Sequence, residues 1–294
     1  MYAQFFGNYL LSKRAVTAEQ VIQAMEEQHI RHLKVGTLAI HAGYMSTSQV
    51  DDILMRQSQN QGKRFGELAI EAGYLNKEQL ESLLHQQIPI YLLIGQRLVE
   101  NGALTNTQLD NLIISYQQEN QLSQLENATL QKENLHTLIR NLFLITYSDI
   151  PEYLIKYLSL LFNNLIRFIG EDFMPLNPIL CQEYVTNHCY GQIINGEYSL
   201  TSYLDIEEDS AIAFASRYVK EDFTAFNEYV RASIEDFLNI HNGLFNVNIS
   251  NEDSIELLLN PPVNLENTMI SSSSNILHLP IIYPFGTLNI LIKV

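Results

Sequence analysis

The sequence contains no tryptophan and only two cysteines. Cys181 and Cys189 have neither CxxC nor paired zinc-ligand spacing, so we predict neither a disulfide scaffold nor a metal site. No GxxxxGK[ST], GxGxxG, GxSxG or HExxH motif occurs, which leaves nucleotide hydrolysis, dinucleotide redox chemistry, serine hydrolysis and zinc proteolysis without a local signal. No apolar run approaches the ~20 residues of a membrane-spanning helix, and no signal sequence opens the chain. We therefore expect a cytoplasmic protein without membrane insertion.

Basic residues are also scarce. Lys and Arg number 17 against 33 Asp and Glu, a net charge of -16, which argues against nucleic acid or an anionic membrane as partner. The imbalance lies mainly in residues 119–294, with 8 basic and 22 acidic residues, whereas residues 1–118 have 9 and 11. With 294 residues, 46% of them hydrophobic, the chain is long enough for about two domains with packed cores.

Glycines recur at intervals of 29, 30 and 29 residues in the first part of the chain, at Gly7, Gly36, Gly66 and Gly95. Ten residues after each glycine comes a helix N-cap residue, at Thr17, Ser46, Asn76 and Thr105. A glutamine follows each cap by three residues, as in a capping box, and an apolar stripe at i, i+3, i+4 comes next. We therefore predict four copies of a short helix, a turn and a longer helix, which stack because neither helix buries its stripe alone.

Copies two and three resemble the MshEN domain, the N-terminal domain of type II secretion and pilus ATPases. The likeness consists of a basic residue, two glycines and a terminal glutamine: Lys34, Gly36, Gly43 and Gln57, then Arg64, Gly66, Gly73 and Gln87. Some members of that family bind cyclic di-GMP, so the resemblance implies this nucleotide as a ligand of these eight residues. Glycines would let backbone amides approach phosphate, and a guanidinium would stack on a purine. A degenerate stack that only docks a partner stays open as the alternative.

Residues 119–150 are rich in Gln, Asn, Glu and Leu and contain no glycine or proline. Their broken apolar stripe predicts a solvent-exposed helical linker, which pairs with its copy if the protein is a dimer. Another helix is expected over 151–169, because Pro151 suits a helix start and the segment has a strongly apolar face.

Strand-like and helix-like segments alternate beyond Pro178. Strands are predicted at 190–195 and 198–204, which flank Gly196 as a hairpin, and at 255–259, 276–283 and 287–294, with the serine run 271–274 as a connection between strands. Helices are predicted at 205–219 and 223–241, the second closed by Asn242 and Gly243. The predicted fold class is α+β with several domains: an all-helical repeat module at 1–118, the linker at 119–150, and at 151–294 an α/β domain with an antiparallel-rich sheet and long helices on one face.

Asp236 and Asn239 stand three residues apart on the second of these helices, so they share one helix face. A carboxylate can bind a lysine in another protein's acyl-phosphate site while a carboxamide orients a water in line with phosphorus. An isolated Asp-x-x-Asn usually marks no more than a solvated helix face.

The segment from Asp236 to Gly243 resembles the signature of the CheC/CheX family of response-regulator phosphatases. In that family an acid, two residues and an asparagine are followed after 22 residues by a proline, and Pro262 has this spacing. With one such helix the chain looks closest to CheX. The family's acid is usually Glu, and the position of Ala232 usually carries Asp or Ser.

This resemblance implies that Asp236 and Asn239 are catalytic and that the partner is a phosphorylated CheY-like receiver. It further implies Mg²⁺ on that receiver, no cofactor required in this chain, and a homodimer. We therefore predict a chemotaxis-type signalling protein that promotes hydrolysis of the receiver's aspartyl phosphate, with an N-terminal module that senses cyclic di-GMP or docks a partner. The alternative is a non-enzymatic adaptor whose phosphatase motif has degenerated.

Overall fold

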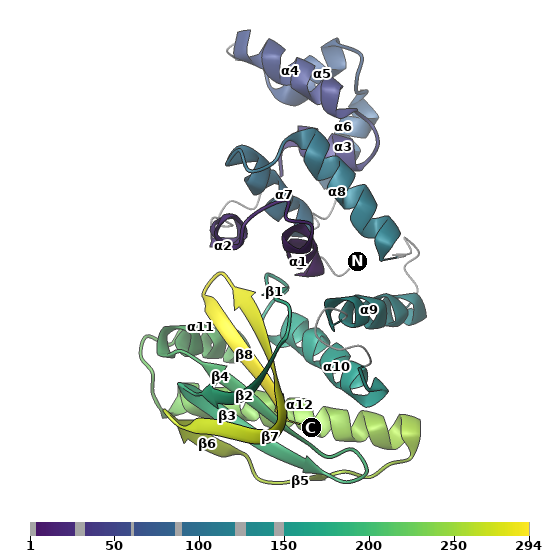
Figure 1. The fold of residues 1–294 in the computed structure, drawn as a ribbon. Helices are drawn as coiled ribbons and strands as arrows, with labels where there is room; N and C mark the ends of the chain where they lie inside the picture. The colour runs from purple at the N-terminus through teal and green to yellow at the C-terminus, as the bar shows by residue number, and fades with distance from the viewer. Residues whose placement is uncertain are drawn as a thin grey trace. The chain divides into compact units, whose positions relative to one another are not determined.

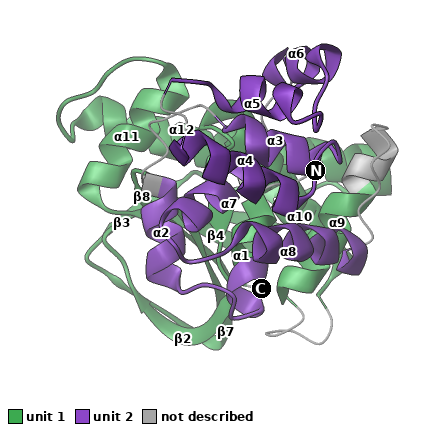
Figure 2. Ribbon diagram, turned by 90° about the horizontal axis from the view of Figure 1, so that it is seen from above, with its two compact units in different colours: residues 1–8, 122–294 green, residues 9–121 purple. Residues whose placement is uncertain are grey.

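The structure, a computed structural model, describes residues 4–26, 33–59, 62–85, 90–120, 128–143 and 150–293. Within these ranges the fold is mixed, with twelve helices and eight strands (Figure 1). The chain divides into two compact units, residues 9–121 and residues 1–8 with 122–294 (Figure 2). Among the described helices, none is long and apolar enough to cross a membrane.

Residues 9–121 form a helical unit, to which the second half of the first helix also belongs. Its helices are α1 (Gln4–Ser12), α2 (Ala18–Glu26), α3 (Val35–His41), α4 (Thr47–Gln59), α5 (Phe65–Glu71), α6 (Lys77–His85), α7 (Ile90–Glu100) and α8 (Asn106–Glu119). Each pair of helices is joined by a turn whose equivalent residue has a positive φ, at Arg14, Gly43, Gly73 and Gly102. The predicted helix–turn–helix repeat is therefore confirmed in all four copies.

All four predicted capping boxes are present. The cap side chain accepts a hydrogen bond from the backbone N–H of the glutamine three residues on, and the glutamine side chain accepts one from the backbone N–H of the cap. In copy four these two distances are 3.1 Å and 2.8 Å, and the same pairs form at Thr17–Gln20, Ser46–Gln49 and Asn76–Gln79. Reciprocal capping thus fixes where each second helix begins.

The four copies pack as two pairs, one of copies two and three and the other of copies one and four. Copies two and three exchange contacts, because α4 packs on α5 and α3 packs on α6. Copies one and four are joined by α2 and α7, and by Tyr9, whose hydroxyl donates to Glu119 at 3.1 Å and whose ring meets Tyr116. Contacts of α8 with α3 and α4 join the two pairs, so the predicted stacking is confirmed.

The other unit, residues 1–8 with 122–294, contains two helices ahead of its sheet, α9 (Ala128–Phe143) and α10 (Glu152–Phe168). α9 packs on α10 and buries Leu135, Leu138 and Leu142. The expectation of a solvent-exposed linker helix is therefore wrong over 133–143, because the apolar stripe there is covered by the same chain. The rest of that stripe, Leu122 and Leu125, lies outside the described residues.

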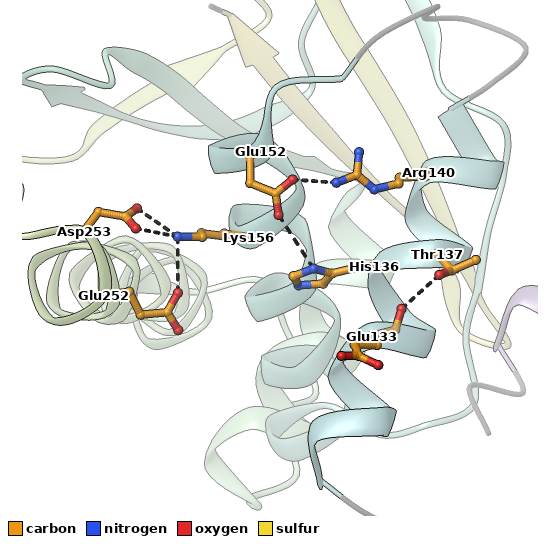
Figure 3. Close-up of polar contacts among 8 residues, drawn as sticks. All are labelled: Glu133, His136, Thr137, Arg140, Glu152, Lys156, Glu252 and Asp253. Atoms are coloured by element: carbon orange, nitrogen blue, oxygen red, sulfur yellow. Dashed lines mark hydrogen bonds and ion pairs between the residues drawn. The ribbon is translucent and has the colours of Figure 1, made fainter. Parts of the chain in front are cut away.

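Ion pairs link these helices to the end of a later one, α12 (Glu228–Asp253) (Figure 3). Arg140 on α9 pairs with Glu152 on α10 at 2.5 Å. Lys156, also on α10, lies 2.8 Å from Asp253 and 3.3 Å from Glu252. The three helices are thereby joined at one end by partly exposed charges, whose individual contributions to stability are small.

A curled, fully antiparallel sheet forms the rest of the unit. Its strands are β1 (Met174–Pro175), β2 (Ile179–Val185), β3 (His188–Asn195), β4 (Leu200–Ile206), β5 (Leu258–Leu259), β6 (Val263–Glu266), β7 (Met269–Tyr283) and β8 (Gly286–Lys293). The order is β1-β7-β8-β4-β3-β5, with β2 also paired to β7 and β6 to β3. Every pairing is antiparallel, which confirms the predicted sheet type and the β3–β4 hairpin.

Helices pack on this sheet and a second small core lies among its strands. α12 contacts β3, β4 and β5, whereas α11 (Glu208–Val219) contacts β8 and α12. Elsewhere in the sheet, Cys189, Ile270, Ile276 and Leu291 form a separate apolar cluster. Because the sheet is curled, strands that are not neighbours in it share this cluster. The cluster also supports β3, on which α12 packs.

Several predicted boundaries are wrong, and two of them differ by seven residues or more. α12 does not end at Asn242–Gly243 but continues through Gly243 to Asp253, because Phe245 and Ile249 keep the helix buried against the rest of the unit. The serine run 271–274 is not a loop but part of the long strand β7, where Ser271 pairs with Glu183 of β2. Backbone pairing with β2 overrides the low strand preference of serine there.

Candidate functional site

α12 presents one buried face and one exposed face. Asn227 begins it by accepting hydrogen bonds from the backbone N–H groups of Tyr229 and Val230, at 3.0 Å and 3.1 Å. The buried stripe includes Ile234, Phe237, Leu238, His241, Asn242 and Phe245. The helical period places Ala232, Asp236 and Asn239 on the other side, and all three are exposed. The predicted acid and amide therefore share one solvent-facing surface.

Asp236 is held by a tyrosine from the neighbouring helix α11. The Tyr218 hydroxyl donates to Asp236 Oδ2 at 2.7 Å. The Tyr218 ring lies edge-on to Phe237 and Phe168, which anchors it. Partial burial is the larger cause and the adjacent Asp236 carboxylate the smaller cause that raises the pKa of Tyr218. The hydroxyl therefore remains a donor at neutral pH. Among the described residues Asp236 forms no ion pair with Lys, Arg or His, which leaves its charge available to a cation from another molecule.

Asn239 is held from below by the sheet. Its Oδ1 accepts a hydrogen bond from Gln192 Nε2 of β3 at 2.8 Å. The same Gln192 nitrogen donates to the backbone carbonyl of Asn260 at 2.9 Å, in the segment that leads to Pro262. An exposed side chain is thus tied to a buried residue that also fixes the neighbouring loop.

Asp236 and Asn239 lie in an open depression of about 830 Å³. Its lining residues are Tyr218, Val219, Glu221, Phe223, Tyr229, Ala232, Ser233, Glu235, Asp236, Asn239 and Pro262. Three of them are acidic and none is basic, and Tyr229 is 74% exposed. The fold therefore brings the proline predicted from the 22-residue spacing to the same surface as the acid and the amide. Such a surface favours a basic group flanked by apolar area.

Comparison with known proteins gives matches among solved structures. No protein-family model and no curated protein matches the chain. It is similar to a CheC-like superfamily protein from Shewanella sp. PV-4, with 18% identity and a TM-score of 0.43 over 49% of this chain and 97% of that one. It is also similar to the chemotaxis protein CheX from Desulfovibrio desulfuricans, with 14% identity and a TM-score of 0.42 over 49% of this chain and 99% of that one.

A third similar structure is the CheX–CheY–BeF3–Mg²⁺ complex from Borrelia burgdorferi, with 17% identity and a TM-score of 0.43. That match covers 48% of this chain and 97% of the other. These three neighbours are CheC- or CheX-like proteins, and each match covers about half of this chain.

The candidate glycines of the repeats have two different surroundings. Gly36 and Gly66 are buried within α3 and α5, where an added Cβ would lie 3.0 Å from Val50 and 2.8 Å from Leu80. Close packing of each copy's two helices therefore favours glycine at both positions. Gly43 and Gly73 instead occupy exposed turns with φ of +69° and +73°, which glycine adopts without strain. The structure thus gives all four glycines a role in folding.

The polar candidates of the repeats differ in how much they are engaged. Lys34 Nζ pairs with Glu100 at 2.8 Å, and Gln57 donates to the backbone carbonyl of Lys63 at 3.2 Å. Arg64 is exposed and makes no ion pair with any described residue, so its guanidinium is available. Gln87 lies outside the described residues.

Two residues of the site, Tyr218 and Gln192, were not predicted from the sequence. Tyr218 precedes Asp236 by 18 residues, and Gln192 lies 47 residues before Asn239, so no local spacing connects them. Gln192 carried one usable signal, since a glutamine between apolar residues of a predicted strand needs a buried partner. In the part of the chain that the structure describes, no three His, Cys, Asp or Glu side chains are arranged to hold a metal ion.

Proposed function

We propose that this protein binds a phosphorylated CheY-like receiver domain through the surface around Asp236 and Asn239 and promotes hydrolysis of its aspartyl phosphate. The observation that carries the proposal is the exposure of a carboxylate and a carboxamide on one helix face, within the open depression that Pro262 also lines. Each side chain accepts one hydrogen bond from this chain, from Tyr218 and from Gln192 respectively, and is otherwise open to a partner.

The chemistry requires little more than position. Asp236 would bind the receiver's active-site lysine through the carboxylate oxygen that Tyr218 does not use. Asn239 would donate one N–H to a phosphoryl oxygen and the other to the attacking water, which holds that water in line with phosphorus. The water oxygen bonds to phosphorus as the bond to the receiver's carboxylate breaks, and inorganic phosphate leaves. Mg²⁺ on the receiver would neutralise the developing charge.

The depression suits docking of such a partner. Its acidic lining attracts the receiver's lysine, and exposed Tyr229 and Val219 offer apolar contact beside it. The shorter acid is the main departure from the resembled family, because Asp reaches one methylene less far than Glu. A misplacement of about 1 Å can lower a rate by about a hundredfold, so slow turnover is expected.

The test is dephosphorylation of a panel of phosphorylated receivers by the full chain and by Asn239→Ala. Asn248→Ala is the matched control, since Asn248 is exposed on the same helix outside the depression. We expect Asn239→Ala to abolish acceleration while binding of a beryllofluoride-loaded receiver is retained, and Asn248→Ala to change neither. Binding without acceleration by the unmutated chain would instead identify an adaptor. Absence of both binding and acceleration across the panel would reject the proposal.

A second proposal concerns the repeats, where cyclic di-GMP is the candidate ligand because Arg64 is exposed and free of ion pairs among the described residues. Titration calorimetry of the full chain with cyclic di-GMP should release heat that Arg64→Ala removes and that Lys77→Ala, a change at another exposed cation, preserves. No heat from the unmutated protein would eliminate nucleotide sensing and leave docking as the role of the repeats.

The resemblance also leads us to propose a homodimer. Light scattering of the full chain should give about twice the monomer mass of 33.7 kDa. A monomeric mass at micromolar concentration would contradict this proposal without affecting the two above.

A further inference from the structure

Gln192 lies directly beneath the candidate site and is only 1% exposed. Its polar atoms are all engaged. Nε2 donates to Asn239 Oδ1 and to the Asn260 carbonyl, at 2.8 Å and 2.9 Å, while Oε1 accepts from Asn242 Nδ2 at 2.8 Å. A buried amide with every bond satisfied is held in one orientation, because any flip would leave polar groups unpaired.

The orientation of the Gln192 amide determines the orientation of the Asn239 amide. The backbone carbonyl of Asn260 only accepts hydrogen bonds, so the Gln192 atom beside it must be the amide nitrogen. The same nitrogen faces Asn239, and therefore Asn239 must present its oxygen inward and its NH2 group outward. The amide assignment of Asn239 thus follows from a backbone group and from the hydrogen-bond network around it.

The network continues away from the surface and fixes Gln192 in turn. Asn242 Nδ2 also donates to Ser202 Oγ at 3.0 Å, and Asn242 Oδ1 accepts from the Tyr157 hydroxyl at 2.8 Å. Asn242, Ser202 and Tyr157 are all buried, on α12, β4 and α10 respectively. Three separate elements therefore determine where the Gln192 amide lies.

We infer that Gln192 is a positioning residue for the phosphatase reaction, which holds the exposed Asn239 carboxamide in one rotamer with its NH2 group directed at the docked phosphoryl group. This inference rests on the proposed function. Without Gln192, Asn239 would sample several rotamers and both amide orientations in solvent, and only a small fraction would meet the phosphoryl group correctly.

The first measurement needs no variant and no activity. Side-chain amide resonances of the folded full chain should show two slowly exchanging protons for Gln192, and coupling constants should report a single χ1 rotamer for exposed Asn239. Averaged couplings for Asn239 would overturn the inference whether or not the protein is a phosphatase.

The second measurement compares turnover in variants. Gln192→Met keeps the length of the side chain but removes its hydrogen bonds, and we expect kcat to fall about tenfold or more with KM for the phosphorylated receiver within about twofold. Thr186→Val is the stability control, because it removes buried hydrogen bonds to Thr268 in the same unit but outside the Gln192 network. Gln182→Met, the same change at an exposed position of β2, controls for the substitution itself.

These controls distinguish a loss of kcat caused by lower stability from one caused by lost positioning of Asn239. If Thr186→Val lowers the melting temperature as much as Gln192→Met but leaves kcat unchanged, the positioning role is supported. Equal losses of kcat in both variants would assign the effect to stability and overturn it. A wild-type chain that binds receivers without accelerating hydrolysis rejects the proposed function, and the resonance measurement then still decides the orientation of Asn239.

Discussion

Protonation of His241 should couple the stability of the sheet-containing unit, residues 1–8 with 122–294, to pH. The imidazole is fully buried on α12, two residues after Asn239 but on the opposite face of the helix. One ring nitrogen lies 3.1 Å from Asn164 Nδ2, and the ring is edge-on to Tyr157 at 4.5 Å. Burial lowers the pKa of His241 from its ordinary 6.5 to about 3, because a charged ring there would lose its hydration.

The sign and size of the effect follow from linkage. Between pH 6.5 and pH 3 the unfolded chain binds a proton at this residue that the folded protein does not. The stabilising contribution of neutral His241 is therefore complete above pH 6.5 and is lost as the pH falls toward 3. Each pH unit below 6.5 is worth about 1.4 kcal/mol, so acidification from pH 8 to 5.5 should remove about 1 to 2 kcal/mol of unfolding free energy.

Urea denaturation at pH 5.5, 6.5, 7.2 and 8.0 tests this for the full chain and for His241→Leu. This range stays above the sequence pI of about 4.8, and the sixteen tyrosines provide a near-ultraviolet dichroism signal in a chain without tryptophan. His241→Leu leaves Asn164 without its ring partner, which lowers stability at every pH. The stability difference between the two proteins should therefore shrink by about 1 to 2 kcal/mol from pH 8 to 5.5. A constant difference would show that His241 titrates normally and would refute the reasoning.

Three further predictions concern single positions. Gly66→Ala should destabilise residues 9–121 by about 1 to 3 kcal/mol in urea melts, since the added Cβ lies 2.8 Å from Leu80; no change would contradict the close helix packing. Thr105→Ala should cost about 1 kcal/mol by removing the acceptor that caps α8, again measured by urea denaturation, and an unchanged midpoint would argue against this cap. Asp236→Glu should raise receiver dephosphorylation by up to about a hundredfold, because the longer acid reaches past the Tyr218 hydroxyl; a lower rate would mean that Asp236 is already placed correctly.

The parts of the fold set by local chemistry were predictable. The capping boxes at Thr17, Ser46, Asn76 and Thr105 each depend on residues three apart, so sequence spacing alone identified where four helices begin. The β3–β4 hairpin was equally visible, because Gly196 interrupts two apolar segments and has a positive φ in the turn. The exposed positions of Asp236 and Asn239 follow from helical periodicity in the same way.

Features that depend on partners distant in sequence were not predictable. Asn242 and Gly243 are typical helix terminators, yet α12 continues past them because Asn242 finds buried partners in Gln192, Ser202 and Tyr157. Tertiary hydrogen bonds thus override a local stop signal. The covered face of α9 was missed for the same reason, since only α10 shows what its leucines contact.

The buried amide network explains why α12 has one rotational setting. Apolar packing alone would tolerate small rotations of a helix on a sheet, because hydrophobic contact is not directional. Hydrogen bonds to Gln192, Ser202 and Tyr157 are directional, and a shift by one residue would turn Asn242 about 100° away from all three. The same rotation would carry Asp236 and Asn239 out of the depression. Polar groups buried under α12 therefore determine which residues of its outer face a docking partner contacts. Apolar residues that gave the same stability would not fix this choice.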